Sequence, residues 1–168
     1  MRIRSACVMV AVALSATVLG VGTADATGPL SGTKVRNWQS GYVLGVAANS
    51  TVGGAQVQYE VDTDNLAQKW AIDPVTSDTF MLRNLNSDMC VTAVGGADTE
   101  ALQQRPCDAR WDEQIFSMEA SSKANRYQLK NQAHNKCLNP GTVNNGAYAR
   151  VVACSATNGW NAHSFDVR

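Results

Sequence analysis

The chain has 168 residues, with 14 basic and 14 acidic side chains that give a formal charge of zero at pH 7. This balance excludes the strong electrostatic attraction that basic proteins have for nucleic acids and anionic membranes, so we expect neither as a partner. The length fits one domain with its own hydrophobic core and is too short for two.

The first residues have the pattern of a secretory signal peptide. Arg2 and Arg4 precede an apolar run at 7–22, and a small-x-small site, Ala24-Asp25-Ala26, follows it. The run is shorter than the roughly 20 residues of a membrane-spanning helix, and no basic flank follows it, which favours cleavage over an uncleaved anchor. We predict a signal peptide at 1–26 and a secreted (extracellular) domain at 27–168.

One short phrase then recurs at a spacing of 47 residues and ends each time in asparagine. The three copies are Val35-Arg36-Asn37, Leu82-Arg83-Asn84 and Leu129-Lys130-Asn131. A fixed period in this range marks a supersecondary unit whose copies share one core. The sequence therefore predicts three repeats, at about 33–78, 79–123 and 124–168.

Each repeat contains about four short runs with strand character, separated by residues that favour turns. In the second repeat the runs cover residues 80–85, 89–94, 101–105 and 114–118. No stretch after residue 26 keeps a helical period over three turns. About twelve strands are expected, so the fold class is all-β, and three four-stranded units suit a closed barrel because closure removes exposed strand edges.

Four cysteines remain after the signal peptide. Cys107 follows Cys90 by 17 residues, Cys154 follows Cys137 by the same 17, and each pair lies within one repeat. We predict these two pairs as disulfides, each stabilising by about 3 kcal/mol in an oxidising compartment. The alternative, a redox or metal role, lacks any Cys-x-x-Cys spacing.

Further motifs occur in phase with the repeat. They are Gln68-Lys69-Trp70, Gln114-Ile115-Phe116 and the divergent His163-Ser164-Phe165; Cys90-Val91 and Cys137-Leu138; and Val57-Gln58 and Leu102-Gln103. With these motifs the chain resembles the ricin-type lectin domain, a β-trefoil also found as family 13 carbohydrate-binding modules, over roughly residues 33–168. The resemblance implies a non-enzymatic protein that binds a polysaccharide or glycan. Because Trp70, Phe116 and Phe165 recur at the ends of these motifs, we expect them to form a shared aromatic core.

In sugar-binding repeats of that family, an Asp two residues after the first Cys position grips adjacent hydroxyls. This chain has Gly45, Thr92 and Asn139 there, and only Asn139 keeps a two-headed polar group. The position where an aromatic residue stacks on the sugar holds Arg105 and Val152. We therefore expect degenerate sugar sites, with Asn139, Thr92 and the strand residue Gln103 among the candidate contacts.

A second pair of aromatics adds to the candidates. Trp111 and Trp160 each lie five residues before a motif phenylalanine, next to Asp112 and Asn161. We expect them to be either relocated stacking platforms for sugar or, as the alternative, lids that pack over the disulfides. His163, in place of a motif glutamine, is expected to make that residue's structural hydrogen bonds or, as the alternative, to contact the ligand.

Enzymatic chemistry finds little support in the sequence. The only two histidines, His134 and His163, accompany no known catalytic motif. The acidic stretch at 60–65 lacks the glycine and terminal glutamate of a calcium loop, so we expect no metal and no cofactor. The alternative function is a trefoil that binds an extracellular protein, such as a hydrolase inhibitor, through exposed Trp111 and Trp160.

Overall fold

The computed structural model describes residues 30–166, so the predicted signal peptide at 1–26 lies outside the described residues. These residues form β-strands and four single-turn 3₁₀ helices, with no α-helix among them, which confirms the all-β prediction. The strands are β1 (Leu30–Asn37), β2 (Val43–Val46), β3 (Val57–Glu60), β4 (Trp70–Pro74), β5 (Thr79–Asn84), β6 (Met89–Thr92), β7 (Gln103–Pro106), β8 (Phe116–Ala120), β9 (Tyr127–Asn131), β10 (Lys136–Asn139), β11 (Ala147–Tyr148), β12 (Arg150–Ala153) and β13 (His163–Asp166). The 3₁₀ helices are η1 (Ala47–Asn49), η2 (Leu66–Gln68), η3 (Asp112–Gln114) and η4 (Gly159–Asn161).

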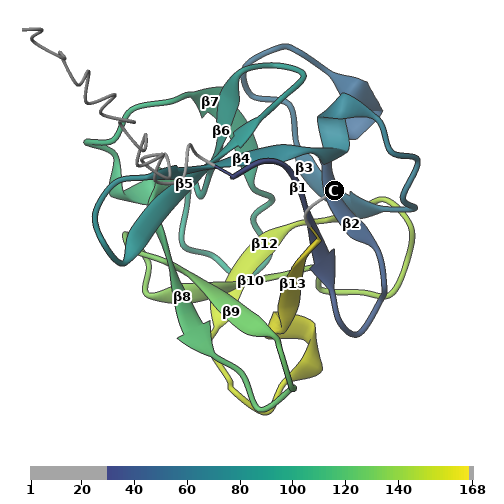
Figure 1. Cartoon of the computed structure of the whole chain (residues 1–168), viewed down its shortest axis with the longest axis vertical. Helices are drawn as coiled ribbons and strands as arrows, with labels where there is room; N and C mark the ends of the chain where they lie inside the picture. The colour runs from purple at the N-terminus through teal and green to yellow at the C-terminus, as the bar shows by residue number, and fades with distance from the viewer. Residues whose placement is uncertain (1–29, 167–168) are drawn as a thin grey trace, which may run out of the picture.

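Six strands close into a barrel. The antiparallel pairs β1–β4, β4–β5, β5–β8, β8–β9, β9–β13 and β13–β1 form an unbroken ring. Three hairpins, β2–β3, β6–β7 and β10–β12, extend from this barrel. In Figure 1 the blue strands of the first unit lie on the right, and β9, β10, β12 and β13 lie together at the bottom. The threefold arrangement is that of a β-trefoil, as predicted.

A cycle of backbone hydrogen bonds joins the three hairpins. The N–H of Val57 donates to the carbonyl of Leu102 (2.8 Å), Leu102 donates to Ala149 (2.7 Å), and Ala149 donates back to Val57 (2.9 Å). All three side chains are buried in the core. Thirteen strands appear where about twelve were expected, because the short strand β11, just before Ala149, pairs with β3 of the first unit in addition to the β10–β12 hairpin.

The repeated asparagines explain the 47-residue phrase. Asn37, Asn84 and Asn131 are fully buried. Each side-chain Nδ2 donates to carbonyls around a 3₁₀ helix of the preceding unit, such as that of Ala67 at 2.8 Å from Asn84. Each Oδ1 accepts from the N–H groups of its own hairpin turn. Only an amide supplies both a donor and an acceptor at this place, so the residue recurs in every copy.

The core triad differs from the prediction in its third member. Trp70 and Phe116 are fully buried opposite Asn84 and Asn131, as expected. The residue opposite Asn37 in the third unit is His163, also fully buried. Phe165 lies two residues further along β13, at the place of Ile72 and Met118, and is only partly buried against the core.

The correction has a simple physical cause. The third copy of the motif is Asn161-Ala162-His163, because Asn161 ends η4 as Gln68 ends η2 and Gln114 ends η3. Asn161 departs from the glutamine of the Gln-x-aromatic pattern, whereas Phe165 is an ordinary core aromatic, so the sequence pattern favours Phe165. The symmetry holds, and the prediction for Phe165 was wrong.

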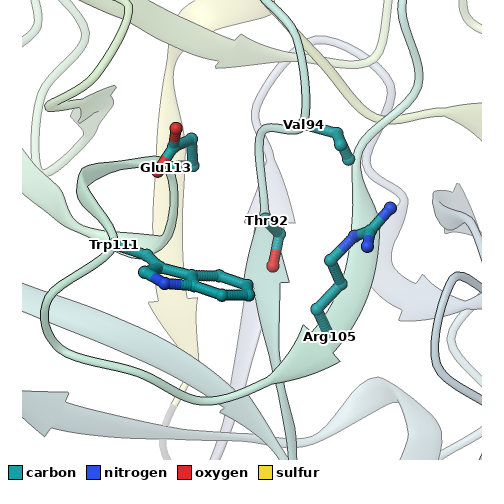
Figure 2. Close-up of a pocket in the computed structure, with 5 residues that line it drawn as sticks. All are labelled: Thr92, Val94, Arg105, Trp111 and Glu113. Carbon is teal, nitrogen blue, oxygen red and sulfur yellow. The ribbon is translucent and has the colours of Figure 1, made fainter.

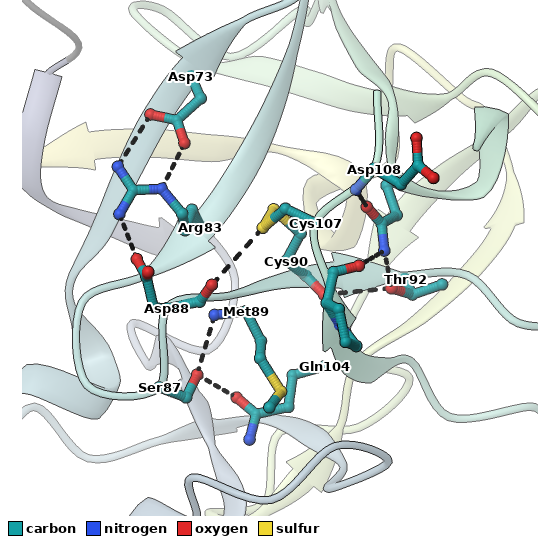
Figure 3. Close-up of a disulfide and its surroundings, with 12 residues drawn as sticks. Asp73, Arg83, Ser87, Asp88, Met89, Cys90, Thr92, Gln104, Cys107 and Asp108 are labelled. Atoms are coloured by element: carbon teal, nitrogen blue, oxygen red, sulfur yellow. Dashed lines mark hydrogen bonds and ion pairs between the residues drawn. A yellow bond between two sulfur atoms is a disulfide. The ribbon is translucent and has the colours of Figure 1, made fainter. Parts of the chain in front are cut away.

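Both disulfides have the predicted pairing. Cys90 bonds to Cys107 and Cys137 bonds to Cys154, each joining the first strand of a hairpin to the residue after its second strand. Figure 3 shows the first bond beside the turn before β6, where Arg83 reaches both Asp73 and Asp88.

Candidate functional site

The three positions expected to grip a sugar face the buried polar residue that begins each motif. In the second unit the Nε2 of Gln114 donates to the hydroxyl of Thr92 at 3.0 Å. In the third unit the Nδ2 of Asn139 donates to the Oδ1 of Asn161 at 2.6 Å. In the first unit Gly45 has no side chain, and the carboxylate of Glu60 occupies its place.

Two contacts show that the Glu60 carboxylate fills the space that a side chain at position 45 would occupy. The Nε2 of Gln68 donates to Glu60 Oε1 at 2.8 Å. A Cβ on Gly45 would lie only 2.5 Å from that same oxygen. The first unit therefore keeps a carboxylate near its motif glutamine, but the neighbouring strand supplies it.

The second unit has a pocket with an exposed indole, which suits a ligand with an apolar face. It has a volume of about 270 Å³ and is lined by Thr92, Val94, Arg105, Trp111 and Glu113 (Figure 2). Trp111 stands just before η3 and exposes 44% of its surface. Because the indole lines this pocket and remains accessible, its placement favours the stacking platform over the lid.

The polar groups around Trp111 differ in whether hydrogen bonds within the protein already engage them. The hydroxyl of Thr92 already donates to the carbonyl of Cys90 (3.1 Å) and accepts from Gln114, so little of it is left for a ligand. The Glu113 carboxylate makes no hydrogen bond or ion pair within residues 30–166, while its backbone carbonyl accepts from Ala93 and fixes its position. Glu113 is thus the free acceptor beside the indole.

The first unit has a pocket of similar volume but different character. Its lining is polar and lacks an aromatic ring: Ala48, Asn49, Gln58, Glu60, Val61, Thr63, Asn65, Gln68, Asn145 and Gly146. Both oxygens of Glu60 accept hydrogen bonds, from Gln68 and from Gln58 at 2.7 Å. This pocket offers hydrogen bonds to a ligand but no surface for stacking.

The predicted residues of the third unit are mostly buried. Asn139 is 5% exposed, and its Oδ1 accepts from the N–H of Gly141 at 2.6 Å, so its amide is engaged at both ends. Asn161 and His163 are fully buried. No ligand can reach these two side chains, so the prediction that they contact sugar is wrong and their roles are structural.

Trp160 does not repeat Trp111. It lies within η4 at the place of Glu113, is half-buried, and its carbonyl accepts from Asn37 at 2.7 Å. The residue that matches Trp111 before the 3₁₀ helix is Asn158. The two indoles are therefore not equivalent platforms.

The remaining predicted contacts, Gln103 and Asp112, belong to the second unit. Gln103 accepts from the guanidinium of Arg105 at 3.0 Å, and Asp112 is exposed next to Trp111 without lining the pocket. Glu113 and Val94 were not predicted, and Arg105 was noted only as a missing aromatic. The one signal for Glu113 was its place directly before the motif Gln114.

Burial determines the protonation of His163. The Nδ1 atom faces the carbonyl of Asn161 at 3.0 Å and therefore carries the proton, while Nε2 accepts from the Tyr59 hydroxyl at 2.6 Å. Desolvation lowers the pKa of His163 to about 4, because no carboxylate stabilises the charged ring. The imidazole is neutral at pH 7.

The acidic stretch at 60–65 contributes to an ion-pair network. Asp62 lies 2.6 Å from Lys34 Nζ and 2.8 Å from the Arg36 guanidinium, and Asp64 lies 2.7 Å from Lys34. Burial alone would raise the pKa of Asp62, but the hydrogen bonds from Lys34 and Arg36 outweigh it and lower the pKa to about 2. Within residues 30–166, no group of three potential metal ligands is found.

The closed six-stranded barrel, its three hairpins and the repeated motifs define a β-trefoil of lectin type. A model described as ricin-type beta-trefoil lectin domain-like matches residues 18–104, and the model of the ricin-type beta-trefoil lectin domain matches residues 78–168. The chain belongs to this family, which supports a carbohydrate-binding module.

Solved structures support the same fold. A designed threefold symmetric protein, ThreeFoil, aligns with a TM-score of 0.72 at 18% identity, over 79% of this chain and 96% of its own. The earthworm R-type lectin C-half in complex with GalNAc aligns with a TM-score of 0.66 at 12% identity, over 82% and 99%. An exo-beta-1,3-galactanase from Clostridium thermocellum aligns with a TM-score of 0.75 at 17% identity, over 82% of this chain but only 30% of the enzyme.

No curated protein matches the chain. Among the described residues, none of the helices has the length and apolar character needed to cross a membrane.

Proposed function

We propose that the protein is a secreted, non-enzymatic lectin that binds glycans mainly through the pocket of its second repeat. The observation that carries the proposal is the exposed indole of Trp111 beside the free carboxylate of Glu113. A sugar ring stacks its C–H face on an indole while a carboxylate accepts from adjacent hydroxyls. The family and the two disulfides support an extracellular location.

The other two repeats contribute less to this proposal. The first offers polar groups without an aromatic surface, and three of the four predicted contacts of the third, Asn139, Asn161 and His163, are buried. Affinity for a single sugar unit is then weak, on the order of millimolar, because one small site buries little surface.

A glycan panel with immobilised protein 27–168 tests the proposal. We expect retention of at least one glycan, and loss of that retention by Trp111→Ala or Glu113→Gln. Trp38→Ala is the matched control, because Trp38 is exposed to nearly the same extent (45%) but lies outside the pocket. Equal loss in both tryptophan variants, or no retention by the wild type, contradicts the proposal.

The alternative is an extracellular protein partner anchored by the same Trp111, since exposed indoles are common binding hot spots. Sugar competition separates the two functions. A protein captured from culture medium in the presence of excess competing glycan, with no glycan retained on the panel, favours the alternative.

A further inference from the structure

Arg105 lines the pocket of the second unit and, like Arg126 and Arg150, forms no ion pair within residues 30–166. Arg36, Arg83 and Arg110 each form an ion pair with aspartate. No carboxylate lies within ion-pair distance of the Arg105 guanidinium among residues 30–166, although Arg105 lines the same pocket as Glu113. The pocket therefore holds a cation and an anion that do not form an ion pair with each other.

The guanidinium also keeps unused hydrogen-bond donors. One terminal nitrogen donates to Gln103 at 3.0 Å, which orients the group. The other terminal nitrogen makes no hydrogen bond within residues 30–166, while the Nε–H is buried and out of a ligand's reach. Guanidinium has five N–H donors in a planar fork that matches carboxylate and sulfate oxygens. A fixed fork with free donors is suited to an anionic group.

The pocket has two chemically distinct sides. Figure 2 shows Trp111 and Glu113 on one side and Arg105 with Val94 on the other, with Thr92 between them. A sugar ring lying on the indole can direct hydroxyls toward Glu113 and an acidic substituent toward Arg105. The same acidic sugar bound in the opposite orientation would place its negative group beside the Glu113 carboxylate, which would repel it.

We propose that the second repeat selects acidic sugars, with Arg105 as the residue that recognises a sugar carboxylate or sulfate ester. This inference rests on the proposed glycan-binding function and specifies its ligand class. The equivalent positions of the other repeats hold Glu60 and Val152, opposite Val43 and Cys137 as Arg105 is opposite Cys90. Only the second repeat has a cation there.

The test compares three probes of equal length: a neutral galactose trimer, a galacturonic acid trimer and a sulfated galactose trimer. Calorimetric titration of the mature protein should show at least one acidic probe binding about tenfold more tightly than the neutral one at low salt. The difference should shrink at high salt, since this pocket is open to solvent. The two acidic probes distinguish a carboxylate from a sulfate.

Variants assign the effect to the arginine. Arg105→Gln should lose about tenfold in affinity for the acidic probe and leave neutral binding unchanged, while Arg105→Lys should retain part of the preference. Arg126→Gln is the matched control, because its Nε is also buried without a partner but it does not line this pocket.

The outcomes separate this inference from the function beneath it. Equal binding of neutral and acidic probes, or an acidic preference that survives Arg105→Gln, overturns the role of Arg105 while the lectin function stands. Absence of binding by every probe here and every glycan on the panel overturns both.

Discussion

The first repeat stabilises its hairpin differently from the equivalent hairpins of the second and third repeats. In repeats two and three a disulfide joins the first strand to the residue after the second strand. The equivalent positions of the first repeat are Val43 and Asp62, and Asp62 pairs with Lys34 and Arg36 instead. An ion-pair network thus stands where its sister repeats have a covalent bond.

This difference makes the repeats respond to different conditions. Reductant can act on repeats two and three but has no bond to break in repeat one. Acid and salt weaken the pairs of Asp62, because protonation removes its charge and ions screen it. Lys34 is nearly inaccessible, at 1% side-chain exposure, so its charge depends on these partners.

The largest expected effect comes from removing a covalent bond. Replacing Cys137 and Cys154 by serine should lower the free energy of unfolding by about 3 kcal/mol, because the unfolded chain regains the entropy of the loop. Urea unfolding measures the change. In the serine variant, reductant should lower the free energy of unfolding by only half as much as in the wild type, because one disulfide remains. An unchanged effect of reductant would contradict the assignment of the Cys137–Cys154 bond.

A similar loss in the free energy of unfolding is expected on acidification, because His163 is buried in the core. His163 has a folded pKa of about 4, below its ordinary value of 6.5, so the unfolded chain binds more protons between these values. Its contribution is fully present above pH 6.5 and declines as the pH falls toward 4, by about 3 kcal/mol in total. Urea midpoints between pH 7 and pH 4 measure this decline.

The matched variant removes both members of the buried pair. With His163→Phe and Tyr59→Phe, the third unit gains a phenylalanine where the second has Phe116, and no Tyr59 hydroxyl is left without a partner. The slope of stability against pH should then flatten between pH 6.5 and 4. A slope equal to that of the wild type would assign the effect to other groups.

A smaller effect is expected from the ion-pair network of the first repeat. Asp62→Asn should cost about 2 kcal/mol at pH 7, since the folded pKa of Asp62 is about 2 and its ordinary value is 3.8. The contribution is present above pH 3.8 and is lost as the pH falls toward 2. The gap between variant and wild type should therefore close in acid, and a gap that persists at pH 2 would exclude the charge as its source.

The sequence predicted the features that depend on identical residues in phase. The asparagines, the cysteines and the motif ends Trp70 and Phe116 recur at nearly constant spacing, so repeats and disulfides followed from counting. Spacing alone favoured His163, which follows Phe116 by the repeat period of 47 residues, while Phe165 follows it by 49. Residue type favoured Phe165 instead, because the Tyr59 hydroxyl that the buried imidazole uses as a partner lies more than one hundred residues away in the chain.

The candidate site was predicted only in part, for a related reason. Trp111 was identified from its residue type, but the pocket also needs Thr92 from β6, Arg105 from β7 and Glu113 from η3. Their proximity depends on the hairpin register and on the 3₁₀ turn. Asn139 looked suitable by type, yet the structure uses both ends of its amide internally.

The smallest expected effect is also the sharpest test of the comparison between repeats. Val43→Cys with Asp62→Cys places two cysteines at the positions that match Cys90 and Cys107, so a third disulfide should form. Its gain of about 3 kcal/mol is offset by about 2 kcal/mol from the lost pairs of Asp62, which leaves a net gain near 1 kcal/mol. Thiol titration measures whether the bond forms, and urea unfolding measures its effect on stability.

Val43→Ser with Asp62→Ser is the control without a bond, and it should be less stable than the wild type. If the two cysteines stay reduced under oxidising conditions, the first hairpin does not share the geometry of the other two.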